Sequence, residues 1–338
     1  SIAAGVAYLR ALTGGGLSVD EAFGQLEFRY AASADQFTTM AALRAARRLW
    51  DRVGEVSGAS PEARAQRQHA VTSSVMTTKH DPWVNMLRTT VACFAAGVGG
   101  ADAVTVQPFD AALGLPDSFS RRIARNTQSL LVEEGHLARV LDPAGGSWYV
   151  ESLTESLAQA AWEWFTEIER AGGLVAALDS GLVRDRIAAA WDERAERLAH
   201  RTDAITGVSE FPNLAETLPA RRPAANVLPR GGLPRVRAAQ EFEELRDRAA
   251  AVVPGVRLFG DDAQGQLFAA AADDEGGPRF LERLRLAAGL LELVVAAIEV
   301  GRRLGEEQLE HLAGFAEAAD PLARRVEGDA HAGVLVLV

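Results

Sequence analysis

The chain has 338 residues, 48% of them hydrophobic and 24% charged, a balance that is typical of a folded globular protein and excludes an intrinsically disordered one. Its net charge of -11 argues against unassisted nucleic-acid binding, which needs a basic surface, although a local arginine cluster can still bind an anion. No apolar run reaches the roughly 18–20 residues of a membrane span, and no signal peptide is recognisable.

The chain opens with helical patterns. Residues 1–13 predict an amphipathic helix that ends at three consecutive glycines, and the spacing of Ser18 and Glu21 predicts a capping box at the start of the next helix. Residues 26–31 alternate apolar and polar side chains, as a short strand does. The first helix begins without a cap and residues 332–338 read as a buried strand, so we expect a piece of a longer protein.

A longer helix is predicted over residues 36–53, where apolar side chains recur at helical spacing. This helix carries Arg44, Arg47 and Arg48. We interpret the three arginines as a solvated helix face rather than as an anion site, because charged runs on helices usually face water.

Two strand–loop–helix units follow, and each consists of a short apolar run and then a helical pattern. Repetition of this unit is typical of a parallel barrel or of a doubly wound sheet. We expect Asp81 to cap the first helix with Pro82 at its first position, and Asp117 or Ser118 to cap the second. The predicted elements are a polar loop at 57–67, strands at 70–75 and 102–106, and helices at 82–97 and 117–134.

Cys93 is the single cysteine of the chain, so no internal disulfide is possible and the reducing cytoplasm is the expected compartment. The residue lies within the apolar pattern of the helix predicted at 82–97. Buried packing is therefore the expected role of its thiol, rather than nucleophilic catalysis.

The second half of the chain predicts two further regions. Residues 142–149 form a turn-rich crossing, and residues 152–200 are helical with a break at Gly172 and Gly173. Five prolines between 207 and 234 indicate an extended linker. From residue 236 an incomplete α/β unit is expected, with helices at 237–251, 281–304 and 309–319 and strands at 256–259 and 333–338.

Polar residues at the predicted strand ends are the first candidates for a site, because parallel barrels take catalytic groups from these ends. His69 starts its strand, which favours a structural role, whereas Thr105 and Gln107 share one face. Neither His80 next to Asp81 nor His136 after two glutamates has metal-ligand spacing. The full candidate set is Arg67, His69, Thr72, Ser73, Asp102, Thr105 and Gln107.

Several long phrases follow one another along the chain: Arg44 to Trp50, Asp81-Pro82 with Asn85 and Arg88 to Thr90, Phe109-Asp110 with Ala112 to Pro116, Arg122 to Gln128, and Asp142-Pro143 with Gly146 to Thr154. Residues 1–215 carrying them resemble the barrel domain of the adenosylcobalamin-dependent acyl-CoA mutases, methylmalonyl-CoA mutase above all. The resemblance implies an α/β fold in which residues 1–150 are the second half of a (β/α)8 TIM barrel.

The same resemblance implies the organisation of the rest of the chain. Residues 151–235 would be a helical and proline-rich linker, and residues 236–338 a partial, degenerate flavodoxin-like unit similar to the family's cobalamin domain. Arg67 matches a residue that contacts the coenzyme A arm, so Arg67, His69 and Gln107 are the candidate substrate-binding residues. For Arg67, a surface position at a loop end is an equal alternative.

Departures from the family's pattern bear on catalysis. On the seventh strand of the implied barrel, Val71 stands where catalytic chains of the family have glutamine. On the eighth strand, Asp102 and Thr105 stand where those chains have glutamine and histidine. An anion in place of a neutral donor disfavours the original reaction. The phrase from Thr206 to Asn213 resembles the small, non-catalytic subunit. We therefore expect no catalytic residue here and a degenerate site at Val71, Asp102 and Thr105.

A histidine near the carboxyl end imitates the family's cobalamin signature, Asp-x-His-x-x-Gly. Asp329 and His331 fit, but Gly333 comes one residue early and the later elements of the signature do not follow. We interpret His331 as part of a turn before a strand, and expect neither cobalamin nor a metal in this chain.

The resemblance leaves three hypotheses. The leading one is a small mutase subunit that supports a large catalytic subunit in a cytoplasmic heterodimer, with adenosylcobalamin and the acyl-CoA bound by the partner. The second is an active acyl-CoA mutase, of which this chain is a fragment. The third is a scaffold that kept the barrel without an enzymatic role. Neither nucleic acid nor a membrane is an expected partner.

Overall fold

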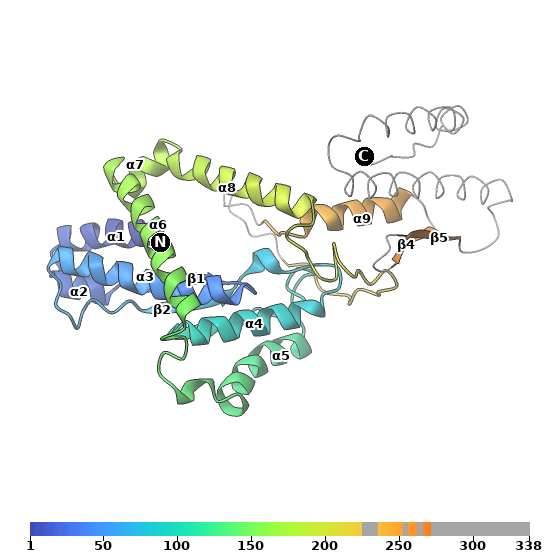
Figure 1. The fold of residues 1–338 in the computed structure, drawn as a ribbon, viewed down its shortest axis with the longest axis horizontal. Helices are drawn as coiled ribbons and strands as arrows, with labels where there is room; N and C mark the ends of the chain where they lie inside the picture. Colours follow the sequence, from blue (N-terminus) through green and yellow to red (C-terminus); the bar gives the residue numbers. More distant parts are fainter. Residues whose placement is uncertain (225–235, 253–255, 262–265, 272–338) are drawn as a thin grey trace. The chain divides into compact units, whose positions relative to one another are not determined.

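The computed structural model describes residues 1–224, 236–252, 256–261 and 266–271 (Figure 1). The chain divides into two compact units, Ser1–Glu244 and Leu245–Val338. The helices predicted at 281–304 and 309–319, the strand predicted at 333–338, and His331 lie outside the described residues. Within the described part, no helix has the length and apolarity that crossing a bilayer needs.

The first unit is built on a parallel sheet of three strands in the order β1-β2-β3. The strands are β1 (Phe28–Ala32), β2 (Gln68–Thr72) and β3 (Ala103–Thr105), and helices α3 (Gln36–Ser57) and α4 (Val84–Val98) connect them. Tyr30 pairs with Ala70, which pairs in turn with Val104. The predicted α/β class is confirmed by this sheet, whereas the half barrel stays a prediction.

One face of this sheet is covered by the two connecting helices. Ala70 packs against Leu43 of α3 and against Ala92 and Ala96 of α4. Side chains alternate along a strand, so the odd-numbered residues of β2 and β3 and their partners on β1 point the other way. We call this second side the open face, since four of its six residues are exposed: it comprises Arg29, Ala31, His69, Val71, Ala103 and Thr105.

An aromatic core joins the amino-terminal helices to the sheet. Trp50 of α3 lies between Phe23 and Phe28, with ring centroids 4.8 Å and 4.7 Å away. Helix α1 (Ile2–Gly14) reaches this core through Gly5, where a Cβ atom would lie 2.7 Å from the Phe28 ring. The predicted capping box of Ser18 and Glu21 starts α2 (Val19–Gly24) and is confirmed.

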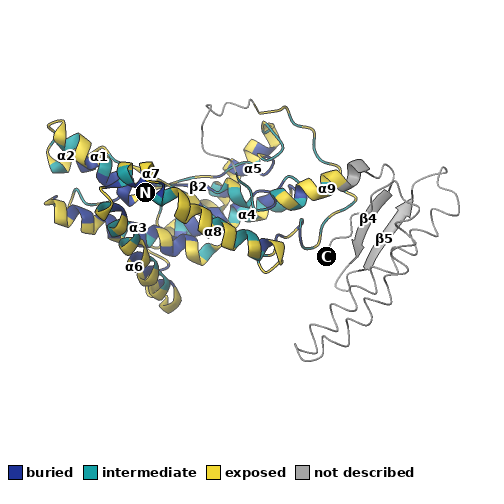
Figure 2. Ribbon diagram, turned by 90° about the horizontal axis from the view of Figure 1, so that it is seen from above, coloured by how far each residue is buried: buried dark blue, intermediate teal, exposed yellow. Residues whose placement is uncertain are grey.

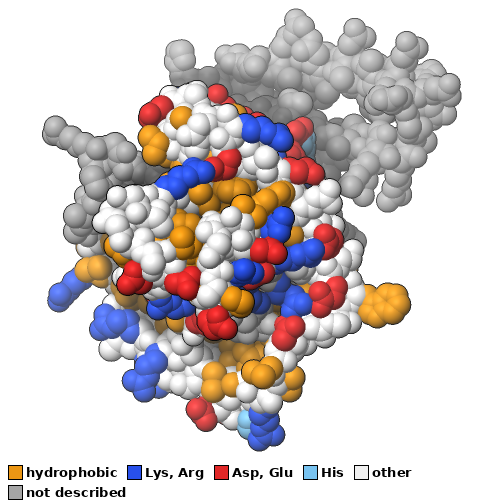
Figure 3. Space-filling view, turned by 90° about the vertical axis from the view of Figure 1, so that its left-hand side faces the viewer, with side chains coloured by type: hydrophobic (Ala, Val, Ile, Leu, Met, Phe, Trp, Pro, Cys, Tyr) orange, Lys and Arg blue, Asp and Glu red, His pale blue; other side chains and the backbone are white. Residues whose placement is uncertain are grey.

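Helix α6 (Trp148–Arg170) packs against α3, and α7 (Leu174–Asp179) and α8 (Leu182–Ala199) continue the predicted helical region (Figures 1 and 2). Ion pairs join the two long helices. Arg48 of α3 pairs with Glu155, and both side chains are exposed. Figure 3 accordingly shows acidic and basic side chains interspersed on this side of the molecule.

The interpretation of the α3 arginines as a solvated face is wrong for two of them. The Arg44 side chain is largely buried and pairs with Asp142 and Glu151. Arg47 donates to the Gly99 and Gly100 carbonyl oxygens at 2.7 Å and 3.2 Å, and burial lowers its pKa. Because Gly99 and Gly100 follow α4, Arg47 complements the negative end of the helix dipole.

The start of α4 differs from the prediction. Asp81 has a left-handed φ of 45° and the helix begins at Val84, so Asp81 does not cap it. The predicted cap by Asp117 is confirmed for α5 (Ser118–Ser129), where the carboxylate accepts from Ser120 N at 2.8 Å. The remaining predicted helix is replaced by a π-helical turn, Leu130–Glu134. Short 3-10 turns lie at Ser74–Met76 and Leu137–Arg139.

The second unit is described only in part. Helix α9 (Gln240–Val252) begins before the boundary between the units, and β4 (Val256–Asp261) pairs antiparallel with β5 (Gln266–Ala271). A strand at 256–259 is predicted from the sequence, but β5 is not. The flavodoxin-like arrangement of this unit stays a prediction.

Candidate functional site

Two of the predicted site residues meet on the open face. His69 Nε2 lies 2.8 Å from Thr105 Oγ1, and the other ring nitrogen lies 3.8 Å from a Glu27 carboxylate oxygen. Val71 stands beside Thr105 in the register of the sheet and is buried. The only ring on this face is therefore held by a neighbouring strand, and Val71 adds no polar group.

Arg67 and Asp102 lie at the amino end of the sheet. The Arg67 guanidinium donates to the Gly24 carbonyl oxygen at the end of α2. The Asp102 carboxylate accepts from Gln68 N at 2.7 Å, and Asp102 N donates to the Gln68 carbonyl at 3.0 Å. Both side chains thus bind backbone groups of neighbouring segments, at the opposite end of the strands from Gln107.

The carboxyl ends of the strands are fixed by their own polar groups. Thr72 Oγ1 accepts from Gln107 N at 2.8 Å, and Ser73 N donates to the Ala32 carbonyl at 2.7 Å. Gln107 is half-buried at this end. The three candidate ligand residues are consequently not brought together, because Arg67 and His69 lie toward the amino ends of the strands.

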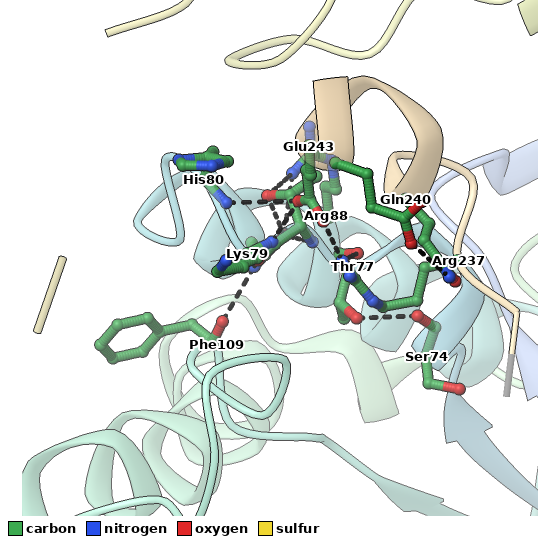
Figure 4. A network of polar contacts seen from close by, with 12 residues as sticks. Ser74, Thr77, Lys79, His80, Arg88, Phe109, Arg237, Gln240 and Glu243 are labelled. Atoms are coloured by element: carbon green, nitrogen blue, oxygen red, sulfur yellow. Dashed lines mark hydrogen bonds and ion pairs between the residues drawn. The ribbon is translucent and has the colours of Figure 1, made fainter. Parts of the chain in front are cut away.

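A polar network that sequence reasoning missed surrounds the loop after β2, residues 77–81 (Figure 4). Its partner is an extended segment, residues 205–224 and 236–244, which we call the strap. Glu243 of the strap is 2% exposed; its Oε1 accepts from Lys79 N and, at 3.2 Å, from His80 N. Its Oε2 lies 2.5 Å from the Arg237 guanidinium. One buried carboxylate therefore organises both segments.

A second strap carboxylate binds the same loop. Glu216 Oε1 lies 2.7 Å from His80 Nδ1, and its Oε2 accepts from Asp81 N at 2.7 Å. The side chains of His80 and Glu216 are both buried. Donation of the Asp81 amide to Glu216 accompanies the left-handed conformation that prevents Asp81 from capping α4.

Asn85 is the hub behind this loop. Its Oδ1 accepts from Thr78 N at 3.0 Å and from Arg88 at 2.8 Å, while its Nδ2 donates to the carbonyl oxygens of Thr78 and Phe109. Arg88 also donates to the strap at Thr206 O, 2.5 Å away, and burial lowers its pKa. These two members of the resembling phrases thus have structural roles.

The strap also crosses the loop after β3. Arg221 pairs with the fully buried Asp110 and, at 3.1 Å, with Asp117. Leu115 N donates to Arg222 O at 2.8 Å beside Gly114, whose φ is +151°. A Cβ atom on Gly114 would lie 2.4 Å from that oxygen, so glycine is what lets the strap approach.

The described residues provide few side chains that could hold a metal ion or act as a nucleophile. Among residues 1–224 and the shorter described stretches after them, no group of three acidic, histidine or cysteine side chains could hold a metal ion. One ring nitrogen of His69 is engaged by Thr105, and one ring nitrogen of His80 is engaged by Glu216. Burial raises the pKa of the Cys93 thiol to about 11, which suits packing.

Comparison with known proteins assigns the chain to a family. The family model described as methylmalonyl-CoA mutase matches residues 1–251. The methylmalonyl-CoA mutase small subunit of Streptomyces virginiae is 69% identical over 251 residues, which cover 74% of this chain and 40% of that protein. The small subunit of Propionibacterium freudenreichii subsp. shermanii is 46% identical over 260 residues, 77% of this chain and 41% of its own.

A relative without a subunit designation is more distant than these two. Methylmalonyl-CoA mutase of Escherichia coli K12 is 38% identical over 212 residues, which cover 62% of this chain and 30% of that protein. The chain thus spans about two-fifths of the length of the small subunits that it matches. Since the family model covers most of the chain, the chain belongs to the methylmalonyl-CoA mutase family.

Proposed function

We propose that this chain is part of a small mutase subunit that supports a large catalytic subunit in the interconversion of methylmalonyl-CoA and succinyl-CoA. The printed names of the Streptomyces and Propionibacterium relatives favour the small-subunit type, and a small subunit implies a larger partner. Adenosylcobalamin and the acyl-CoA would bind to that partner.

The half barrel is part of this proposal. Helices α3 and α4 both cover the same face of the sheet, whereas a doubly wound sheet places helices on both faces. The open face would then be the inner side of a barrel that this chain completes together with further strands. Its residues would line the lumen.

The main observation in favour of a supporting, non-catalytic role for this chain is the contact between His69 and Thr105. A lumen that holds a thioester and radical intermediates needs polar groups aimed at the ligand. Here the one ring is held at 2.8 Å by a neighbouring side chain, Val71 is apolar, and Asp102 binds a backbone amide. The cofactor's chemistry, hydrogen abstraction and 1,2-rearrangement, would therefore take place in the partner.

Reconstitution tests this proposal. The full-length chain and the large subunit are purified separately and together, and conversion of methylmalonyl-CoA is followed for each sample with adenosylcobalamin present. Activity that requires the large subunit and rises when this chain is added supports the proposal. Turnover by this chain alone would favour an active mutase, and a stable complex without any effect on turnover would favour a scaffold.

A further inference from the structure

Helix α4 reverses the usual distribution of side chains on a surface helix. Its exposed side chains, together with that of Trp83 at its N-cap, are all large and apolar. Surface helices normally carry polar or charged groups at such positions. We call the set the α4 ridge: Trp83, Leu87, Val91 and Phe94, exposed by 45%, 67%, 37% and 36%.

The ridge forms one continuous stripe along the helix. Spacings of four, four and three residues place the four side chains on one side of the cylinder over three turns. The buried residues Ala92 and Ala96 face the sheet, so the ridge points away from it. Arg88, the one charged residue of α4, is engaged with Asn85 and Thr206.

Aromatic contacts extend this surface toward α5. Trp83 stacks on Phe109 with ring centroids 4.9 Å apart, and Phe109 meets Phe119 at 6.1 Å. The Arg122 guanidinium lies over the Phe119 ring, 5.5 Å from its centroid. Arg122 is exposed on α5, so the apolar surface has a cationic border at Phe119 in a chain whose net charge is negative.

The most exposed ridge residue, Leu87, adds little to the stability of the first unit. A side chain that keeps two-thirds of its surface in water, as Leu87 does, gains little free energy from burial within its own chain. Contiguous apolar surface of this kind marks interaction sites in folded proteins. Its stabilising contribution must come from another surface that covers it.

We propose that the α4 ridge is the docking surface for a helix of the large mutase subunit. The inference rests on the proposed function for the identity of the partner. Side chains repeating every three or four residues fit the grooves of another helix. Carboxylates beside the apolar stripe of that helix would complement the cationic border. The relatives are named small subunits, which implies a larger subunit to which the helix belongs.

Leu87→Glu tests the surface in the full-length chain. Leu87 is the most exposed ridge residue, so a glutamate there leaves the fold intact but puts a charge into the apolar contact. Ile187→Glu on α8 is the matched control, since Ile187 is 65% exposed and lies within a helix. Affinity for the large subunit is measured by titration calorimetry, with thermal unfolding of each variant recorded in parallel.

The expected result is a loss of about tenfold or more in affinity for Leu87→Glu, with unchanged binding by Ile187→Glu and unchanged melting of both. Equal binding by Leu87→Glu and the wild-type chain would overturn the docking surface while leaving the proposed function intact. If the wild-type chain instead forms homodimers that Leu87→Glu abolishes, the partner assignment is wrong. If the wild-type chain binds no large subunit, the proposed function itself fails.

Discussion

The His69 ring on β2 and the Thr105 hydroxyl on β3 lie 2.8 Å apart across the open face of the sheet. The resemblance to the mutases leads us to expect substrate-binding or catalytic side chains at both positions. Here the two side chains satisfy each other, since the hydroxyl can donate to or accept from the ring. The pair therefore ties two strands together instead of presenting a free ring.

Thr105→Val tests whether this pair has any part in turnover. The valine keeps the shape but cannot bond to His69, so the free energy of unfolding should fall by less than about 1 kcal/mol for a partly exposed hydrogen bond. Turnover of the reconstituted complex should be unchanged. A large fall in kcat with normal assembly would show that Thr105 takes part in the chemistry.

Glu243→Ala should strongly destabilise the first unit. The carboxylate is buried and accepts from two backbone amides and from Arg237, so its removal leaves the partly buried Arg237 cation and two amides without their acceptor. We expect the free energy of unfolding in urea to fall by about 3–5 kcal/mol. Glu241→Ala, on the exposed side of α9, is the control, and an equal effect of both would contradict the role of Glu243.

Gly114→Ala should disturb the contact between the strap and the loop after β3. The φ of Gly114 is +151°, and a Cβ atom added there would lie 2.4 Å from Arg222 O, so a methyl group has no room. The expected loss of stability is about 1–3 kcal/mol, with faster proteolytic cleavage near Arg221. Gly24→Ala meets no atom within 4 Å and should behave like the wild-type chain. Equal cleavage of both variants would show that the approach is not restrictive.

Cys93 provides a measure of native packing. Burial raises the pKa of its thiol from 9.0 to about 11, so the native thiolate fraction at pH 8 is about a hundredfold below that of the unfolded chain. Alkylation should be slower by about that factor and should accelerate on unfolding. The native state holds the proton to higher pH, so this thiol lowers stability as pH rises from 9.0 toward 11. Fast labelling of folded protein would contradict burial.

Local signals allowed much of the fold to be predicted. The Ser18 capping box, the Asp117 cap and the alternation of strands and helices depend on neighbouring residues, and the structure confirms them. The boundaries of β2 and β3 moved by a few residues, because pairing with neighbouring strands decides where each ladder ends. Asp81 carries a local cap signal too, but its amide binds Glu216, 135 residues away.

The polar network around the loop after β2 had no comparable signal. Glu216 lies in a segment whose prolines indicate a linker, and Glu243 lies in a pattern that predicts a charged helix. Nothing near them in the sequence marks either carboxylate as buried. Their partners in the loop after β2 lie more than a hundred residues earlier in the chain. Such contacts follow from tertiary structure alone, which overrides what composition suggests for the strap.

The supporting role of this chain is tested most directly by an adenosylcobalamin titration, followed by absorbance, of the full-length chain, the large subunit and their complex. We predict that the complex binds one equivalent of cofactor, that the large subunit supplies its binding site, and that this chain alone does not change the spectrum. Stoichiometric binding by this chain alone, accompanied by turnover of methylmalonyl-CoA, would contradict its supporting role.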